Sequence, residues 1–206
     1  MNCNDLYEGE YKNGNPTYYV DKGCRILFTG HLEEYFKGKL SRECDIVNGI
    51  MEGIEKIYYD FEDCLEMYRE VKENRNNGLS IEYYKNGQIM NIATAIDEYY
   101  IIDFYSYTEQ GKQQEIWVLE EGEQWQHHCY YYTEDGKIRE TWKRADIGLI
   151  AMNYAANKER IVQIRKRCQL EKRKFCFTLK KIFKHKFWIY DATLMQFRYN
   201  HDAFPV

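Results

Sequence analysis

Apolar and polar residues alternate with a period of two through the first two thirds of the chain. Leu79, Ile81 and Tyr83 are typical, because successive residues of an extended strand point to opposite faces and these three then share one face. Asn86 and Gly87 follow, a pair that suits the positive φ angles of a tight hairpin turn. This stretch therefore predicts a strand, a turn and a returning strand.

The same unit recurs as an aromatic pair, a short turn with a glycine, and another alternating run. The aromatic positions are Tyr18-Tyr19, Tyr35-Phe36, Tyr58-Tyr59, Tyr83-Tyr84, Tyr105 with Tyr107, and Tyr131-Tyr132. The turn glycines are Gly14, Gly23, Gly38, Gly87, Gly111 and Gly136, and the copy over residues 58–64 has none. A lone hairpin is marginal in water, whereas stacked hairpins bury one face continuously. The repeats predict a mainly β fold, an elongated antiparallel meander of hairpins.

A second set of glycines precedes later aromatic pairs by a few residues. Gly49, Gly53 and Gly78 belong to it, and they are predicted to form turns between units. Successive aromatic pairs start 17, 23, 25, 22 and 26 residues apart, so the register of the first unit stays open.

From about Ala145 the apolar period changes to three, four or seven residues, which predicts helix. The stripe consists of Ile147, Ile150, Tyr154, Ile161, Ile164, Cys168, Phe175, Leu179 and Ile182. Asn157, Glu171 and Thr178 interrupt it, so we expect one or two C-terminal α-helices. The cluster at 187–190 and the tail to Val206 fit either a strand or a packed coil.

Composition agrees with the β prediction, because 20 Tyr, 10 Phe and 4 Trp stand against only 2 Pro in 206 residues. The seven cysteines are odd in number and show no disulfide framework. The N-terminus has no signal-like apolar run, and no stretch reaches 18 consecutive apolar residues. These features predict a reduced cytoplasmic protein with no membrane-spanning helix.

Charge divides the chain into two parts. Residues 143–206 hold 15 Lys/Arg and 5 Asp/Glu, whereas residues 1–142 hold the remaining 14 and 28. The asymmetry predicts an acidic hairpin-repeat domain over 1–142 and a basic helical segment over 143–206 that packs on or beside the repeats.

The Tyr-Tyr-x-x-Gly turns, the lead-in from Gly49 to Tyr59 and the Tyr11-Lys-Asn-Gly14 turn resemble the MORN-variant repeat family. This family is a divergent branch found in many bacterial antitoxin and immunity proteins. The resemblance covers about 7–142. It implies a hairpin-repeat scaffold that binds a toxin. Two units depart from the pattern in their glycine or spacing, and nothing after Trp142 fits it.

Residues suited to catalysis are sparse. None of the three serines, Ser41, Ser80 and Ser106, lies in a Gly-x-Ser-x-Gly setting, and there is no phosphate-binding loop. The single His/Cys cluster, His127-His128-Cys129, lacks the second ligand pair of a zinc site and is read as a strand or turn with exposed imidazoles and a packed thiol. We expect no enzyme, metal or cofactor. A pair of carboxylates distant in sequence, as in glycosidases, remains an alternative.

Two acidic groups, the second flanked by tryptophans, stand out as a footprint for a basic protein partner, although solvated strand edges would have the same composition. The predicted partner-binding residues are Asp60, Glu62, Asp63, Glu66, Trp117, Glu120, Glu121, Glu123 and Trp125.

The segment 158–186 holds 12 Lys/Arg against Glu159 and Glu171. It is expected to dock on the chain's own acidic sheet, with an apolar stripe as the cover, and membrane or nucleic-acid binding is the alternative. The stripe is Phe175, Leu179, Ile182 and Phe183, and the alternative basic surface is Lys172, Arg173 and Lys174.

Together these features predict a non-catalytic binding protein, monomeric or dimeric. The leading hypothesis is an immunity or antitoxin protein that neutralises a basic toxin encoded nearby, without a small-molecule substrate. The alternative is a MORN-like scaffold whose basic helix tethers a complex to an anionic membrane or nucleic acid.

Overall fold

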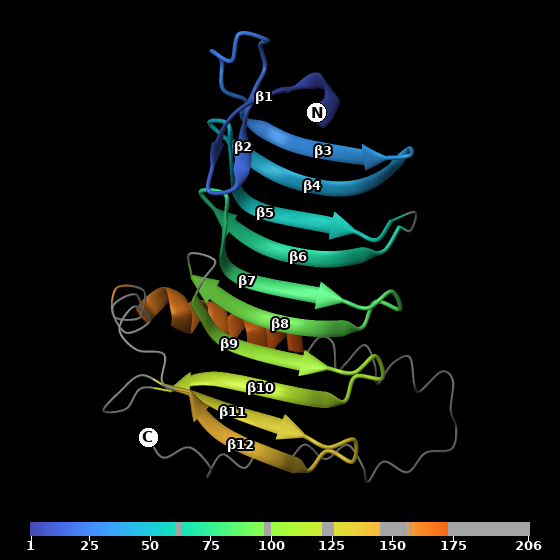
Figure 1. Ribbon diagram of the computed structural model, residues 1–206, viewed down its shortest axis with the longest axis vertical. Helices are drawn as coiled ribbons and strands as arrows, with labels where there is room; N and C mark the ends of the chain where they lie inside the picture. The colour runs from blue at the N-terminus through green and yellow to red at the C-terminus, as the bar shows by residue number, and fades with distance from the viewer. Residues whose placement is uncertain (61–62, 97–99, 121–125, 145–155, 157, 173–206) are drawn as a thin grey trace. The chain divides into compact units, whose positions relative to one another are not determined.

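The computed structural model describes residues 1–60, 63–96, 100–120, 126–144, 156 and 158–172 (Figure 1). The chain divides into two units, Met1–Glu171 and Lys172–Val206, and the description concerns the first. It is mainly β, with a ten-stranded antiparallel sheet and one helix after it, which confirms the predicted fold class. A short 3-10 helix, η1 (Cys3–Asp5), comes first. The strands are β1 (Tyr7–Lys12), β2 (Asn15–Tyr19), β3 (Gly30–Phe36), β4 (Lys39–Val47), β5 (Ile50–Tyr58), β6 (Leu65–Lys72), β7 (Arg75–Tyr83), β8 (Ile89–Ile96), β9 (Tyr100–Tyr107), β10 (Gln113–Glu120), β11 (Gln126–Tyr132) and β12 (Ile138–Arg144).

The large sheet is a meander in which every strand from β3 to β12 pairs antiparallel with the next one along the chain. β1 and β2 form a separate two-stranded hairpin. In Figure 1 the turns after β3, β5, β7, β9 and β11 lie along one edge of the sheet. Five of the six predicted aromatic pairs lie at or near the ends of these strands, so the recurring sequence unit is one hairpin of the meander, whereas Tyr18-Tyr19 ends β2.

Five of the six predicted turn glycines occupy hairpin turns. Gly14, Gly38, Gly87, Gly111 and Gly136 all have φ angles between 78° and 83°, where a Cβ is disfavoured. The last three close the same loop, since each glycine N–H donates to a carbonyl three residues earlier at 2.8–2.9 Å. Gly23 also lies in a turn, in which the Cys24 amide donates to the Asp21 carbonyl at 3.0 Å. It lies between β2 and β3, in a loop held by the Asp21 carboxylate, which accepts from the Arg25 and Ile26 amides.

The second glycine set has two structural roles. Gly49 forms the tight turn between β4 and β5 with Asn48, as predicted. Gly53 and Gly78 instead lie inside β5 and β7, at irregularities where the strand register shifts, so their assignment to turns is wrong. Their φ angles of 102° and 145° explain the glycines, because an L side chain would be strained there.

Cross-strand pairing defines two faces of the sheet. Face one carries the row Leu32, Cys44, Glu55, Arg69, Ser80, Ala93, Phe104, Trp117, Cys129 and Trp142, in which each residue is the direct partner of the next. Face two carries the row Glu33, Glu43, Lys56, Tyr68, Ile81, Ile92, Tyr105, Ile116, Tyr130 and Thr141. Face two is charged near the N-terminus and turns apolar from β7 onward.

The N-terminal segment covers face one at the start of the sheet. Leu6, Tyr18 and Phe28 from this segment pack with Leu32 and Ile46 in one buried cluster, which also includes Cys44, Met51 and Val71. The edge of β3 is also covered, because the Met1 ammonium donates to the His31 carbonyl and the Glu33 amide donates to the Met1 carbonyl. This region is an apolar core of ordinary kind.

The helix over residues 158–172 covers face two in the middle of the sheet. Ile161, Ile164 and Cys168, three residues of the predicted stripe, are buried. Ile161 packs with Ile96, and Ile102 and Leu119 complete the cluster. The other members of the stripe lie outside the described residues, as do residues 183 and 187–206. No helix in the described part of the chain is both long and apolar enough to cross a membrane.

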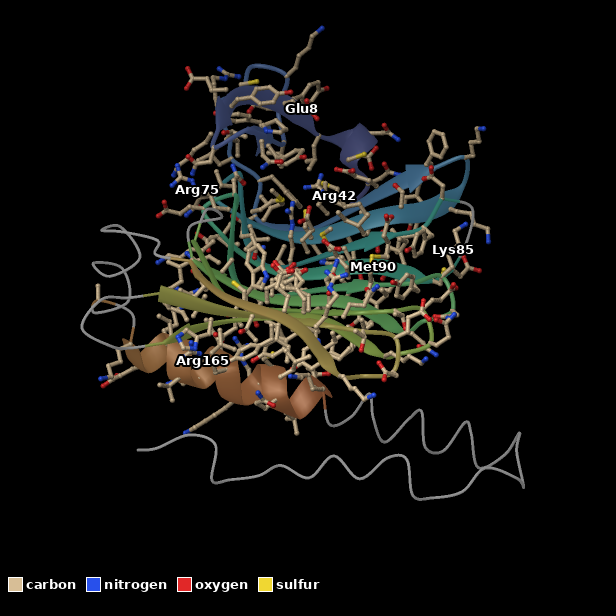
Figure 2. All side chains as sticks on the ribbon, turned by 60° about the horizontal axis from the view of Figure 1, so that its bottom comes forward. Glu8, Arg42, Arg75, Lys85, Met90 and Arg165 are labelled. Atoms are coloured by element: carbon tan, nitrogen blue, oxygen red, sulfur yellow. The ribbon has the colours of Figure 1, made fainter. Side chains whose placement is uncertain are left out.

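Three arginines tie this helix to the sheet. Arg165 makes a bidentate pair with Asp103 at 2.6 and 2.7 Å and also donates to the Leu119 carbonyl. Arg167 pairs with both carboxylate oxygens of Glu70. Arg160 donates to the Asn77 carbonyl at 2.7 Å. Figure 2 shows Arg165 where the helix meets the sheet.

Candidate functional site

A hollow of about 430 Å³ opens on the sheet where the repeat departs from its own pattern. The copy at 58–64 is the one without a turn glycine, and its loop is closed by the Tyr59 amide donating to the Cys64 carbonyl at 3.1 Å. We call this feature the hairpin hollow. It is lined by Glu34, Ser41, Arg42, Ile57, Tyr58, Tyr59, Asp60, Glu66 and Lys85.

Two tyrosines of the hollow are fixed by their hydroxyls. Tyr58 donates to Glu43 at 2.8 Å, and Tyr59 donates to the Tyr83 carbonyl of the next hairpin at 2.6 Å. Burial, together with the bond to Glu43, raises the pKa of Tyr58 to about 12. Burial also raises the pKa of Tyr59, and the charge of Glu66 adds to the effect. Both hydroxyls therefore stay protonated near neutral pH and hold the rings in place.

The Tyr59 bond is part of a series that links neighbouring turns. Tyr84, one hairpin later, donates in the same way to the Tyr107 carbonyl at 2.9 Å. Farther along, the Lys112 ammonium donates to the Glu134 carbonyl at 3.1 Å. Each turn is thus braced by the next, and the hollow lies on a stiff edge of the sheet.

Arg42 belongs to a buried charge network beside the hollow. Its Nη1 lies 2.8 Å from Glu34 and its Nε lies 2.7 Å from Glu55, whose side chain is only 1% exposed. Arg69 pairs with the other oxygen of Glu55. A buried charge persists only when it is paired in this way. The network therefore fixes Arg42 and Glu34 as part of the lining.

Some of the remaining charged side chains in and around the hollow have an interaction partner and others have none among the described residues. The Lys85 ammonium lies over the Tyr59 ring, 5.4 Å from its centroid, a cation–π arrangement. Within the described part of the chain, no hydrogen bond or ion pair engages the carboxylates of Asp60 and Glu66. Asp63 pairs with Lys39 at 3.2 Å and is highly exposed. Fixed aromatic rings thus stand beside two carboxylates that have room for a partner. Figure 2 labels Arg42 and Lys85 among the side chains of this half of the sheet.

The predicted partner-binding residues do not form one group. Asp60 and Glu66 line the hollow, and Asp63 lies in the same loop. Trp117 is on β10, half-buried, with its ring 5.5 Å from that of Phe104 and its indole N–H donating to Glu115. Glu120 ends β10, and its side chain is not among those described. Glu62, Glu121, Glu123, Trp125, Arg173 and Lys174 lie outside the described residues, whereas Lys172 is the last described residue of the helix.

Glu34, Arg42 and Lys85 are members of the hollow that sequence reasoning missed. Glu34 and Arg42 come from the β3–β4 hairpin and Lys85 comes from the β7–β8 turn, so no local motif joins them to the loop at 58–64. The available signal was the missing glycine at 58–64, since a copy that loses its turn residue changes the edge of the array at that point.

A second polar cluster lies on face two. The two ring nitrogens of His31 contact Asp45 at 2.8 Å and Glu43 at 3.2 Å, and Lys56 also pairs with Glu43. The hydrogen bond to Asp45, followed by that to Glu43, raises the pKa of His31. The bond from Lys56 leads the interactions that lower the pKa of Glu43 to about 2. The charged side chains of this cluster pair with one another, which is typical of a solvated sheet surface.

The His127-His128-Cys129 cluster lies on β11. Cys129 is buried, as expected for a packed thiol, but His127 is buried as well, so the prediction of exposed imidazoles is wrong for it. The centroid of the His127 ring lies 6.3 Å from that of the Trp117 ring. In the described part of the chain, no three His, Cys, Asp or Glu side chains gather as metal ligands.

Comparison with known proteins adds no relative: no protein-family model matches this chain, and no curated protein matches it at a significant level.

Proposed function

We propose that this chain is a non-catalytic binding protein of the immunity or antitoxin kind, which neutralises a basic protein toxin by direct contact. The observation that carries the proposal is the hairpin hollow. It combines two fixed tyrosine rings with the carboxylates of Asp60 and Glu66, which no described group engages. Aromatic anchors in a pocket are the usual composition of an interface centre, and charges around it steer the oppositely charged partner.

Electrostatics supports a basic partner. The segment 1–142 carries 28 acidic and 14 basic residues, and such a surface speeds the encounter with an oppositely charged protein. A toxin that acts on nucleic acid would be basic for the same reason, because it must bind phosphate groups. Its basic surface is then the part that an acidic inhibitor occludes.

The chemistry of the hollow supports binding rather than catalysis. Among the described residues of its lining, Ser41 is the only serine or cysteine, and its hydroxyl donates to the Glu34 carbonyl at 3.1 Å. Arg42 is held by two carboxylates, and both tyrosine hydroxyls have acceptors. A rigid surface with saturated donors suits recognition better than proton transfer.

The alternative is a scaffold that tethers a complex to an anionic surface through the basic segment. Arg160, Arg165 and Arg167 of the helix are already engaged by the sheet. Only the rest of the basic segment would then be available to a membrane or nucleic acid. This occupancy favours the binding proposal. We also propose that the array is a divergent form of the MORN-variant repeat, on the strength of its recurring Tyr-Tyr-x-x-Gly turns.

The test is complex formation with the product of the neighbouring gene, measured by calorimetry and size-exclusion chromatography. We expect a 1:1 or 2:2 complex that abolishes the toxin's activity and forms more slowly at higher salt. The double charge reversal Asp60→Lys/Glu66→Lys should slow association, whereas Glu134→Lys, in the exposed turn before β12, should have little effect. A purified chain that neither binds nor inhibits that product would overturn the proposal.

A further inference from the structure

The hairpin hollow contains a cation of its own. Lys85 reaches back from the turn between β7 and β8, and its ammonium lies 5.4 Å from the centroid of the Tyr59 ring, which belongs to the previous hairpin. A cation within about 6 Å of an aromatic face is attracted by the ring quadrupole. The face of Tyr59 is therefore already used to hold positive charge.

The Tyr59 ring is prepared for this contact. Its hydroxyl is anchored on the Tyr83 carbonyl, so the ring loses little freedom when a ligand stacks on it. Tyr58, the preceding residue, is held by Glu43 through its hydroxyl. The hollow has a volume of about 430 Å³, which is similar to that of small-ligand sites, and it is open to solvent. It is therefore an open hollow in which a fixed aromatic ring lies beside charged side chains.

We propose that the hairpin hollow is a socket for a guanidinium group, which an arginine side chain of the partner inserts over the Tyr59 ring, and that Lys85 occupies this position in the free protein. The inference rests on the proposed function and specifies its contact. Arginine is favoured over lysine because its planar group stacks on a ring and donates two parallel hydrogen bonds to a carboxylate. Glu66 and Asp60 line the same hollow and supply such acceptors.

The neighbouring hairpin offers a comparison. Lys37 also lies over an aromatic ring, 5.3 Å from the Phe36 centroid, but both residues belong to one exposed turn and neither lines the hollow. A cation over an aromatic ring thus recurs in this array. Among the described residues, only the pair of Lys85 and Tyr59 combines it with a hollow and with carboxylates that no described group engages.

The experiment uses the full chain and two probes, Nα-acetyl-arginine amide and its neutral isostere Nα-acetyl-citrulline amide. Each is titrated while backbone amide resonances are followed by NMR. The arginine probe should give saturable shifts at residues 58–60, 66 and 85, and the citrulline probe should not. Equal responses to the two probes, or arginine shifts confined to other residues, would overturn the proposal.

Variants with matched controls separate the contributions of Lys85, Glu66 and Tyr59 to binding of the arginine probe. Lys85→Met removes the internal cation and should tighten arginine binding about two- to fivefold, whereas Lys37→Met should leave it unchanged. Glu66→Gln should weaken binding, and Glu134→Gln should not. Tyr59→Phe should keep most of the affinity and Tyr59→Leu should lose it. If Tyr59→Leu does not fold, Lys85→Met and Glu66→Gln still test the proposal. Unchanged affinity for the arginine probe in both variants would contradict a guanidinium socket.

The outcomes also distinguish this inference from the function on which it rests. If the toxin binds with unchanged affinity to Lys85→Met and Glu66→Gln, the binding function stands and the socket is wrong. If the arginine probe binds as described but no complex forms with the neighbouring gene product, the socket stands and the toxin hypothesis is wrong.

Discussion

Two regions of one continuous sheet are covered, on opposite faces and by different chemistry. At the N-terminal end the cover lies on face one and is apolar, with Leu6, Tyr18 and Phe28 packed on Leu32. In the middle of the sheet the cover is the helix on face two, which combines Ile161 with arginines held by buried or half-buried carboxylates. The same hairpin unit therefore does not determine which face is buried. The residues at alternate positions determine it, hairpin by hairpin.

The contrast between the apolar cover and the charged helix contact should affect stability most strongly when one charge of the helix contact is removed. Asp103 is 3% exposed on its side chain, and Arg165→Met would leave it buried without its partner. We expect the free energy of unfolding to fall by about 3–5 kcal/mol, as for other broken buried pairs. Urea denaturation measures the loss.

Two further variants serve as controls for this contact. Arg167→Met should cost about 1 kcal/mol or less, because the Arg167 side chain is 51% exposed. Adding Asp103→Asn to Arg165→Met should restore part of the stability by removing the unpaired charge. Equal losses for Arg165→Met and Arg167→Met would contradict the account of the helix contact.

The apolar contacts of the two regions allow a matched comparison. Leu32 is fully buried on face one, and Ile161 is 1% exposed against face two. Each alanine substitution should cost about 2–5 kcal/mol through lost burial and the cavity left behind.

Amide hydrogen exchange should show where in the sheet Leu32→Ala and Ile161→Ala reduce stability. Leu32→Ala should speed exchange first in β3–β5, and Ile161→Ala should speed it first in β8–β10. An identical exchange pattern for the two variants would mean that the regions open as one unit.

The strand glycines give a smaller contrast between the regions. A Cβ at Gly78 would overlap the Glu70 carboxylate that Arg167 holds, whereas one at Gly53 would meet Asp45 at 3.3 Å. Both positions have positive φ angles, so both alanine variants should lose stability, Gly78→Ala by about 1–3 kcal/mol and Gly53→Ala by less. Thermal denaturation of both variants checks the order, and the reverse order would contradict it.

The smallest expected effect is the pH dependence of the charged part of face two. The pKa of His31 is raised above 6.5, so its contribution is fully present below that pH and is lost as the pH rises through the folded value. The pKa of Glu43 falls from 4.5 to about 2, so its contribution is present above pH 4.5 and is lost as the pH falls toward 2. Stability from this cluster should therefore be greatest between about pH 4.5 and 6.5.

Replacing His31 tests the alkaline side of this window. His31→Gln should reduce the loss of stability between pH 6 and 8, by less than about 1 kcal/mol because the imidazole is partly exposed. Urea midpoints at the two pH values measure the change. An unaltered slope in the variant would show that His31 is not the titrating group.

Much of the fold follows from local patterns. The hairpin turns at Gly87, Gly111 and Gly136 were predictable because a positive φ angle strongly favours glycine. Gly53 and Gly78 were misassigned, because glycine also permits positive φ angles inside strands, where the register of the partner strand decides the conformation. Local sequence carries no information on that register.

The candidate site was only half predictable. Asp60 and Glu66 were found because they belong to one acidic run, which is visible in sequence. Glu34, Arg42 and Lys85 reach the same hollow from other hairpins, through the registers of β3 with β4 and of β7 with β8. Trp117 was grouped with the acidic sites by composition, but its ring packs against Phe104 in the row across face one.

The central claim is that the hairpin hollow is the surface that meets a basic protein partner. Amide hydrogen exchange of the chain, alone and in complex with the product of the neighbouring gene, tests it most directly. The account predicts slower exchange in the complex at residues 58–60, at Glu66 and at Lys85, with little change in β10–β12. Protection confined to β10–β12, with none around the hollow, would contradict it.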